Sequence, residues 1–323
     1  MLSTHRALLL AAMALLLPGI ASAQAVFPDR PIRLIVPFAA GGGVDVIGRI
    51  IGRALSENIG VGVVVENRGG AGGINGMDAV AKAAPDGYTL LASHSGFTAM
   101  PGLYAKLPFD PIKDFDGVVT ATSGAYVLAV ANRMPFKSVA EIVSEAKDNP
   151  GKLNYGSAGI GSTVHLAGEF FKSITGTDIL HVPYKGTGPA LNDLVGGHIN
   201  MLFGPVIAIL PLHQNGQLRA LAVTSTKRST LAPDLPTVAE SGVPGFEVLG
   251  WYGLAAPAGT PKEVLAKLNE ATRRALTAPE FVEQLEKQGL EPVGGTPVDA
   301  SAFIKLEVAR WTTIIREAGI KPQ

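Results

Sequence analysis

Short apolar runs alternate along the chain with segments whose apolar residues recur at helical spacing. The first run, residues 32–36, is typical of a strand that is covered on both faces. A glycine turn at residues 41–43 follows, and from Val46 to Leu55 apolar residues recur every three or four positions, which predicts a helix. The first N–H groups of a helix have no partner within it, and glycine lets an anion approach them closely. This turn is therefore a candidate anion site.

The alternation of strands and helices continues through the rest of the chain. It predicts strands at residues 60–66, 89–92, 127–130, 179–184, 199–203, 218–225 and 246–256, and one that starts at Leu153. It predicts helices at residues 78–84, 138–149, 260–278 and 297–318, with one more between the last two. It also predicts a helix after Thr163 and another that begins at Pro189. Residues 153–163 repeat the strand and glycine turn of the opening stretch, so a second anion site of the same kind is expected there.

Several side chains should mark how these helices begin and which way they face. We expect N-caps at Ser138, at Ser162 or Thr163, at Thr260 and at Thr296, and Pro189 at a first helical position. We expect apolar faces made of Leu166, Phe170 and Ile174 in one helix and of Phe303, Leu306, Trp311 and Ile314 in the last.

The order of elements predicts an α/β fold in two lobes. No strand is expected among the last three helices, so they should pack back on the first unit, and the chain then crosses twice, near residues 123–126 and 248–252. We predict a signal peptide at residues 1–23, a first lobe from residues 24–125 plus 249–323, and a second lobe from residues 126–248. Such lobes close on a ligand by hinge motion, and small-molecule sites form preferentially between domains.

The N-terminus has the pattern of a secretory signal peptide. A short basic start with Arg6 precedes an apolar run up to Leu17, and small residues end at Ala23. We expect cleavage between Ala23 and Gln24 and export to the periplasm. No later segment has the eighteen or more consecutive apolar residues that indicate a membrane helix.

Composition narrows the choice of function. Residues 24–323 carry 26 basic and 27 acidic residues, a net charge of −1, which argues against nucleic acid as a partner. The chain has no cysteine, so it has no disulfide and no cysteine-linked lipid. An apolar fraction of 47% over this length is enough for two hydrophobic cores.

Two nucleotide-binding motifs fail at the opening glycine turn. A dinucleotide fingerprint that starts at Gly41 requires glycine at Val46, and a P-loop requires Lys followed by Ser or Thr where Arg49 and Ile50 stand. Glu66, at the end of the second predicted strand, is the one feature that favours a dinucleotide site. We therefore expect no nucleotide and no other cofactor.

Hydrolase and metal motifs fail as well. A nucleophile elbow requires glycine two residues before its serine, but Ser93 precedes Ser95 and Ile160 precedes Ser162 at that spacing. The six histidines show no close pairing of the kind that binds metal. We expect no metal and no catalytic residue.

A set of short motifs resembles one family. They include Val64-Val-Glu-Asn-Arg68 and His181-Val-Pro-Tyr-Lys-Gly186, with others at residues 30–43, 71–73, 85–90, 106–110, 153–157, 218–224 and 257–261. Together they resemble the Bug family of tripartite tricarboxylate transporter substrate-binding receptors, over essentially the whole mature chain. The resemblance implies a type II periplasmic-binding-protein clamp, acting as a monomer, that binds a small carboxylate without metal or cofactor. It also implies a tripartite membrane transporter or a sensor protein as a possible partner.

The resemblance also implies which residues contact the ligand. Carried onto this chain, they are Phe38, Ala39, Gly41, Gly42, Ser93 and Ser95 in the first lobe, and Ser157, Ala158, Gly161, Ser162, His165, Tyr184, Gly186, Thr187 and Gly204 in the second. Two positions depart from the family pattern. Many members have an acid where this chain has Gly204, and Asn-Pro where it has Met100-Pro101, which makes amino acids poorer ligands than plain carboxylates or aromatic acids.

Several of these side chains allow a structural role beside a functional one. Asp45 should stabilise the start of the opening helix, because an acid beside an anion site would repel the anion. His165 fits a ligand contact and a cap equally well, whereas His94 fits loop structure better. His181 and His198 fall on strands and are expected in the core or on the surface.

Two questions stay open at this stage. Trp251 and Tyr252 at the second crossing should pack in the hinge, although an aromatic ligand would favour a stacking role instead. The alternative function is an exported α/β enzyme that acts on a small carboxylate in the same cleft, and it would depend on Ser95 or His165.

Overall fold

The computed structural model describes residues 27–184, 186–320 and 322, so the predicted signal peptide lies outside the described residues. The strands are β1 (Ile32–Val36), β2 (Val63–Asn67), β3 (Thr89–His94), β4 (Phe115–Ala131), β5 (Asn154–Ser157), β6 (Leu180–Pro183), β7 (Met201–Pro205), β8 (Leu218–Val223), β9 (Leu249–Pro257) and β10 (Glu291–Gly294). The helices are α2 (Gly43–Ile59), the 3-10 turn η2 (Ala71–Gly73), α3 (Ile74–Ala81), α4 (Ser95–Leu103), α5 (Val139–Asp148), α6 (Thr163–Thr175), α7 (Thr187–Val195), α8 (Val206–Gln214), α9 (Lys262–Leu276), α10 (Pro279–Glu286) and α11 (Pro297–Glu317).

The first lobe is built on β2, β1, β3, β9 and β4, in that spatial order. β1 is parallel to β2 and β3, whereas β9 is antiparallel to β3 and β4. Helices α2 and α9 cover one face over Leu34 and Leu254, and α3, α4 and α11 cover the other over Ile35 and Trp251. The apolar run of β1 follows from this burial on both faces.

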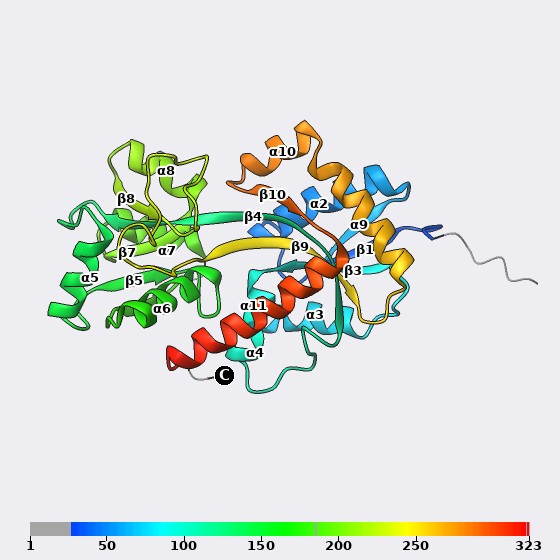
Figure 1. The fold of residues 1–323 in the computed structure, drawn as a ribbon, viewed down its shortest axis with the longest axis horizontal. Coiled ribbons are helices and arrows are strands. Elements are labelled where there is room, and N and C mark those ends of the chain that lie inside the picture. Colours follow the sequence, from blue (N-terminus) through cyan, green and yellow to red (C-terminus); the bar gives the residue numbers. More distant parts are fainter. Residues whose placement is uncertain (1–26, 185, 321, 323) are drawn as a thin grey trace, which may run out of the picture.

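The second lobe repeats the layered arrangement with a smaller sheet. β5 lies parallel to β6 and β7, while β4 runs antiparallel to β7 and β8. Helices α5 and α6 pack on one face over Leu128 and Phe203, and α7 and α8 on the other over Val127 and Leu202. The two lobes lie side by side along the long axis of the molecule (Figure 1).

Two long strands run from one lobe to the other. β4 pairs with β9 up to Ala125 and with β7 from Tyr126, so one continuous strand belongs to both sheets. β9 returns beside it (Figure 1). The predicted two-lobed α/β fold with two crossovers is therefore present, although the sequence pattern revealed only residues 127–130 of β4.

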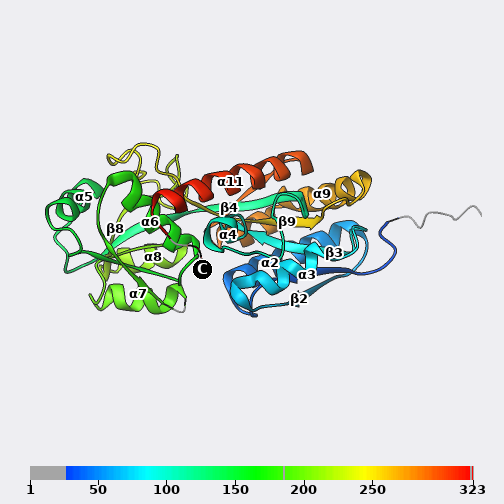
Figure 2. The same cartoon turned by 90° about the horizontal axis from the view of Figure 1, so that it is seen from below.

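Helix α11 also reaches both lobes (Figure 2). Ile304 and Val308, in its middle, belong to the core of the first lobe. Trp311 and Ile315, nearer its end, pack in the core that contains Phe171 of α6. The helix starts as predicted with a capping box at Thr296. Helix α11 therefore packs both on the first lobe and on α6, the helix that follows the second glycine turn.

Two expectations about the C-terminal part are wrong. β10 is a strand among the closing helices, and it pairs antiparallel with β4. Its four residues are too few, and too exposed, to produce a visible alternation. Leu306 is 65% exposed, whereas the next residue, Glu307, faces the interior and is 5% exposed. Glu307 Oε2 accepts a hydrogen bond from the indole N–H of Trp311 at 3.0 Å.

Local helix signals were partly right. Ser138 and Ser162 are N-caps as expected. Thr260 is not, because α9 begins after Pro261 and the Thr260 hydroxyl donates to the carbonyl of Pro257 at 2.7 Å. Pro189 is the third residue of α7 rather than the first, since Gly186 is the N-cap.

The apolar face of α6 is also turned from the expected one. Phe171 is fully buried, whereas Ile174 is 37% exposed. The first lobe's α3 begins at Ile74, four residues before the predicted start, because the glycines ahead of it form a 3-10 turn that continues into the helix.

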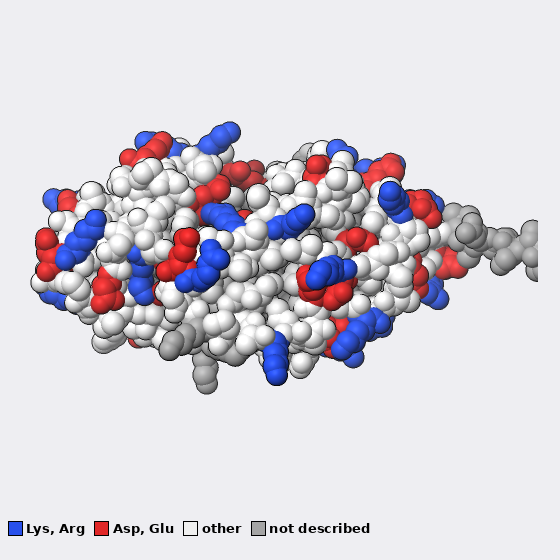
Figure 3. All heavy atoms as spheres, turned by 60° about the horizontal axis from the view of Figure 1, so that its bottom comes forward, with Lys and Arg blue, Asp and Glu red and all other residues white. Residues whose placement is uncertain are grey.

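The outer surface mixes both charges. Acidic and basic side chains are interspersed on the face in Figure 3, as a net charge near zero requires. Within residues 27–184 and 186–320, no helix has both the length and the apolar character of a membrane-spanning segment.

Candidate functional site

The turn between β1 and α2 leaves helix N–H groups without partners. Gly42 is the N-cap and has no side chain to cap the helix. The N–H of Val46 donates to the carbonyl of Gly42 at 3.0 Å, but those of Gly43 and Val44 have no partner among the described residues. Gly41 has a φ of +86°, which glycine adopts without strain. The turn is exposed, so an anion can reach these donors.

Asp45, in the first turn of α2, stabilises the glycine turn that precedes this helix. Its carboxylate accepts hydrogen bonds from the N–H of Gly41 at 2.9 Å and from Asn67 Nδ2 at 2.8 Å, and it pairs with Arg49 at 3.0 Å. The hydrogen bond from Arg49 is the main reason why the pKa of Asp45 is lowered to about 2. Asp45 is 3% exposed, so its role is structural, as expected. The N–H of Gly41 is thereby already occupied.

Replacing Asp45 by alanine should lower the free energy of unfolding by about 2–3 kcal/mol, because it leaves the Gly41 N–H, the Asn67 amide and Arg49 without their shared acceptor. Urea denaturation monitored by circular dichroism measures this loss. The matched control is Glu57→Ala on the same helix, which breaks an exposed pair with Arg53 and should change stability by less than about 0.5 kcal/mol. Equal losses in the two variants would contradict a bracing role for Asp45.

The turn between β5 and α6 forms the matching site in the second lobe. The Ser162 hydroxyl caps α6 by accepting the N–H of His165 at 3.3 Å. The N–H groups of Thr163 and Val164 have no partner within the described residues. Gly161 has a φ of +81°, and its N–H donates to His165 Nδ1 at 3.3 Å. Both lobes therefore present a helix start behind a glycine turn.

A buried polar cluster supports this second turn. The Ser157 hydroxyl and His181 Nε2 lie 2.6 Å apart, and the rings of His165 and His181 are 4.3 Å apart. Tyr155 donates its hydroxyl hydrogen to Glu169 at 2.6 Å, and its ring stacks on that of His181.

Burial controls the charge of these groups. Desolvation, with a contribution from His181, lowers the pKa of His165 to about 4, and desolvation also lowers that of His181. Desolvation and the neighbouring Glu169 raise the pKa of Tyr155. Both imidazoles are therefore uncharged at pH 7, and Glu169 forms an ion pair with Lys172 at 2.9 Å.

Hydroxyl groups from both lobes meet between the two turns. Ser95 Oγ at the start of α4 and Thr163 Oγ1 at the start of α6 are 2.7 Å apart. The Thr163 hydroxyl also lies within hydrogen-bonding reach of Tyr126, whose pKa is raised chiefly by burial. Tyr252 lies beside Gly43, since a Cβ on that glycine would be 3.5 Å from the Tyr252 hydroxyl. The site is therefore made of uncharged donors and acceptors from both lobes and both crossover strands.

Comparison with known proteins identifies the family. The family model described as the tripartite tricarboxylate transporter family receptor matches residues 47–320. The chain belongs to this family. The BugT protein of Bordetella pertussis (strain Tohama I) is 39% identical over 297 residues, which cover 91% of each protein. The resemblance to Bug receptors is thus confirmed.

Solved structures of related receptors have the same fold. The structure of R. palustris Rpa4515 with adipate is 38% identical, with a TM-score of 0.80 over 92% of this chain and 100% of that chain. The structure of MatC (Rpa3494) from Rhodopseudomonas palustris with bound malate is 34% identical, with a TM-score of 0.77 over 90% of this chain and 100% of that chain. The predicted fold class is confirmed, and the protein is a solute-binding receptor.

In this receptor, the accessible residues among the predicted contacts are those of the two turns and the half-buried Tyr184, Gly186 and Thr187 near the start of α7. Phe38, Ala39, Gly41, Gly42, Ala158, Gly161 and Ser162 are exposed or half-buried. Ser157 and His165 lie beneath the second turn, with 0% and 4% of their surface exposed. Ser93 is buried beside β9, while Ser95 reaches Thr163. The two turns and the start of α7 therefore offer the reachable polar groups.

The remaining predicted residues lie around the second turn. Tyr184 donates its hydroxyl hydrogen to Asp193 at 2.6 Å, and burial together with Asp193 raises its pKa to about 12. Gly186 and Thr187 begin α7, a helix without a side-chain cap. Gly204 is buried in β7, and a Cβ there would approach Ile209 Cδ1 to 2.8 Å. A side chain at position 204 would therefore require the Ile209 side chain to shift.

Sequence reasoning missed three members of this constellation. His181 was assigned to the core or surface, yet its Nε2 lies within hydrogen-bonding distance of the Ser157 hydroxyl, and its ring contacts that of His165 at a tilt of 43°. Tyr126 and Thr163 were noted only as a crossing residue and a cap. No spacing rule links these residues, because 16 or more residues separate each from its partner. Across the described residues, no three His, Cys, Asp or Glu side chains are placed to hold a metal ion.

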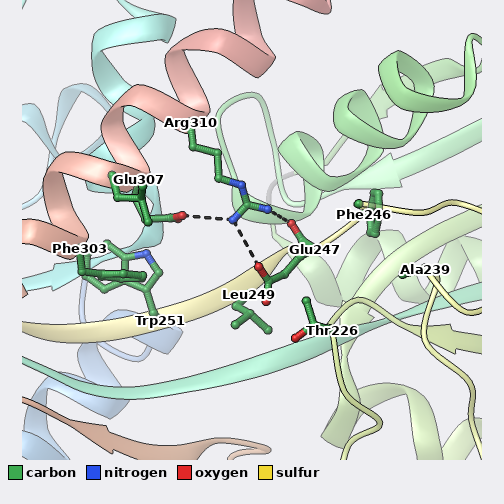
Figure 4. A pocket seen from close by; sticks show the side chains of 11 residues that line it. Thr226, Ala239, Phe246, Glu247, Leu249, Trp251, Phe303, Glu307 and Arg310 are labelled. Atoms are coloured by element: carbon green, nitrogen blue, oxygen red, sulfur yellow. Dashed lines mark hydrogen bonds and ion pairs between the residues drawn. The ribbon is translucent and has the colours of Figure 1, made fainter.

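A cavity of about 520 Å³ lies elsewhere, on the α11 side of β9. Figure 4 shows its wall, where Arg310 points between Glu307 and Glu247 beside Trp251 and Phe303. Trp251 and Tyr252 are neighbours on β9, so their side chains project to opposite faces of the sheet. Trp251 therefore faces this cavity, and Tyr252 faces the α2 turn. The expectation that both pack in the hinge holds fully only for Trp251, which is 2% exposed.

Proposed function

We propose that this receptor captures a small carboxylate in the periplasm, between the turn before α2 and the turn before α6. The observation that carries the proposal is the pair of helix starts, one from each lobe, whose first N–H groups have no partner among the described residues. Backbone N–H groups at a helix N-terminus bind carboxylate oxygens, and the helix dipole favours the negative charge. The adipate and malate in the related structures support this ligand class.

The proposal includes the remaining contact residues and the limits of the lobes. The turns would contact the carboxylate through Phe38 to Gly42 and through Ala158 to Ser162, with Ser93, Ser95, Ser157, His165, Tyr184, Gly186, Thr187 and Gly204 around them. The pairing of β4 with β9 up to Ala125 and with β7 from Tyr126 supports the limits 24–125 plus 249–323 and 126–248. Export would follow cleavage between Ala23 and Gln24.

The receptor would act by binding alone and not as an enzyme. Ser157 is the serine that pairs with a histidine, but it is fully buried and its hydroxyl already accepts the N–H of Gly159 at 3.1 Å. Ser95 is paired with Thr163 rather than with a base. The bound carboxylate would pass to a tripartite membrane transporter or signal to a sensor protein, with the receptor acting as a monomer and without a cofactor.

A thermal-shift screen followed by calorimetry tests the proposal. Adipate, malate and a panel of other organic acids should include at least one that raises the unfolding midpoint by several degrees, because ligand at one hundred times its Kd adds about 2.7 kcal/mol of stability. Adipamide, the uncharged counterpart of adipate, is the matched control and should have no effect. A panel in which no acid shifts the midpoint would refute carboxylate capture, and turnover of a bound acid would favour the enzyme instead.

A further inference from the structure

Three aromatic rings lie in a row on neighbouring strands of the first lobe. Phe38 follows β1, His94 ends β3 and Tyr252 lies on β9, and these strands are adjacent in the sheet. His94 is directly opposite Tyr252 in the antiparallel pair, so the two side chains project to the same face. The rings of Phe38 and His94 meet edge to face, with centroids 5.1 Å apart. The row therefore lies beside the N-terminus of α2, on the sheet face that this helix covers.

Tyr252 brings a hydroxyl without a partner to that helix start. The hydroxyl lies close to Gly43, the first residue of α2, and forms no hydrogen bond with any described residue. Burial alone raises the pKa of Tyr252, so the hydroxyl keeps its hydrogen at pH 7. A neutral phenol next to unpaired helix N–H groups is a further donor for the same oxygen atoms.

His94 contributes a buried donor without a partner. Its Nδ1 accepts the N–H of Gly96 at 3.1 Å, so the hydrogen of the neutral ring is on Nε2. Burial lowers the pKa of His94 to about 4, which keeps the ring neutral at pH 7. Nε2 is fully buried and has no hydrogen-bond partner among the described residues. The His94 residue as a whole is 92% buried, and a buried donor without a partner destabilises the fold. An acceptor from outside the chain would remove this cost.

We propose that the Tyr252 hydroxyl and His94 Nε2–H donate hydrogen bonds to the ligand, directly or through one water, and so complete the anion site of α2. The proposal rests on the carboxylate capture proposed above and adds a requirement to it. Phe38, whose ring packs on His94, is the first residue of the turn that would hold the ligand, so a movement of this turn opens His94 to the cleft. His94 Nε2–H can only donate, so the ligand atom that faces it directly is a hydrogen-bond acceptor, such as an oxygen of a carboxylate, a ketone or a hydroxyl group, and not an amide nitrogen or an ammonium group.

Two single substitutions remove these donors and keep the fold. His94→Asn retains an oxygen that can cap α4 through the N–H of Gly96 but has no group at the position of Nε2. Tyr252→Phe removes only the hydroxyl. The matched control is Tyr88→Phe, because the Tyr88 hydroxyl bonds Asp29 at 2.6 Å far from both turns. We expect each cleft variant to bind adipate and malate about tenfold more weakly by calorimetry, with the unfolding midpoint of the free protein not lowered by His94→Asn.

Imidazole NMR provides a readout that a purely structural role would not change. In the ¹⁵N-labelled receptor, the Nε2–H resonance of His94, assigned by its absence in His94→Asn, should shift when adipate or malate is added to saturation. An unchanged resonance and wild-type affinity in both variants would overturn the role of the two donors while leaving carboxylate capture intact. A wild-type receptor that binds no acid of the panel would instead refute the proposed function itself.

Discussion

Replacing Gly43 by proline should weaken carboxylate binding about ten- to hundredfold without unfolding the receptor. Proline removes the N–H of the first residue of α2, and a hydrogen bond to a charged group is worth about 1.5–3 kcal/mol. The first helical position tolerates proline, and Gly42 already has the extended φ of −78° and ψ of 165° that suit a residue before proline. Calorimetry with an acid of the panel that binds the wild-type receptor measures the change in Kd.

Gly43→Ala is the control that separates the missing donor from added bulk. It keeps the N–H and adds a Cβ at an ordinary contact distance of 3.5 Å from the Tyr252 hydroxyl. We expect its affinity to stay within about threefold of wild type, since no backbone donor is lost. If proline and alanine weaken binding equally, the helix start is not the anion donor, and the proposed site must lie elsewhere in the receptor.

Acidification from pH 7.5 to pH 4.5 should cost the receptor much of its stability. His94 and His165 have pKa values of about 4 in the folded state, below the value of 6.5 in an unfolded chain. Between these values the unfolded chain binds protons that the folded protein does not, so stability is complete above pH 6.5 and falls as the pH drops towards 4. A shift from 6.5 to about 4 corresponds to roughly 3 kcal/mol for each histidine, a large part of a typical total.

Urea denaturation at a series of pH values measures this slope. His94→Asn should make it shallower, because one of the imidazoles with a lowered pKa is then absent, while His165 and His181 remain. Asp45 does not interfere, since its pKa of about 2 keeps it ionised throughout this range. A denaturation midpoint that stays constant from pH 7.5 to pH 4.5 would mean that both histidines can be protonated without loss of structure.

The contact between the lobes also bears on how ligand enters. Ser95 at the start of α4 and Thr163 at the start of α6 lie 2.7 Å apart, and α11 packs on both lobes, so the two lobes are in contact. Hinge motion of the two crossover strands, the movement by which such lobes separate, would break this hydroxyl pair.

The sequence by itself determined the local features of this receptor. The strand, glycine turn and helix at residues 32–59 were predictable because hydrophobic periodicity and turn chemistry act between neighbours in the chain. The caps at Ser138, Ser162 and Thr296 followed for the same reason. The alternating elements implied two lobes and two crossovers, and the motifs implied the family.

Only the tertiary structure decided how distant residues share their polar groups. Asp45 occupies the N–H of Gly41, His181 holds Ser157 across 24 residues, and His94 faces Tyr252. It also decided that β4 is one strand of 17 residues that belongs to both sheets, and that β10 pairs with β4. It placed Glu307 rather than Leu306 on the buried side of α11, where Glu307 bonds Trp311. Each of these depends on which donor, acceptor or apolar surface reaches a residue from another part of the chain. Propensity and spacing contain no information about such meetings, because packing of the whole fold brings the partners together.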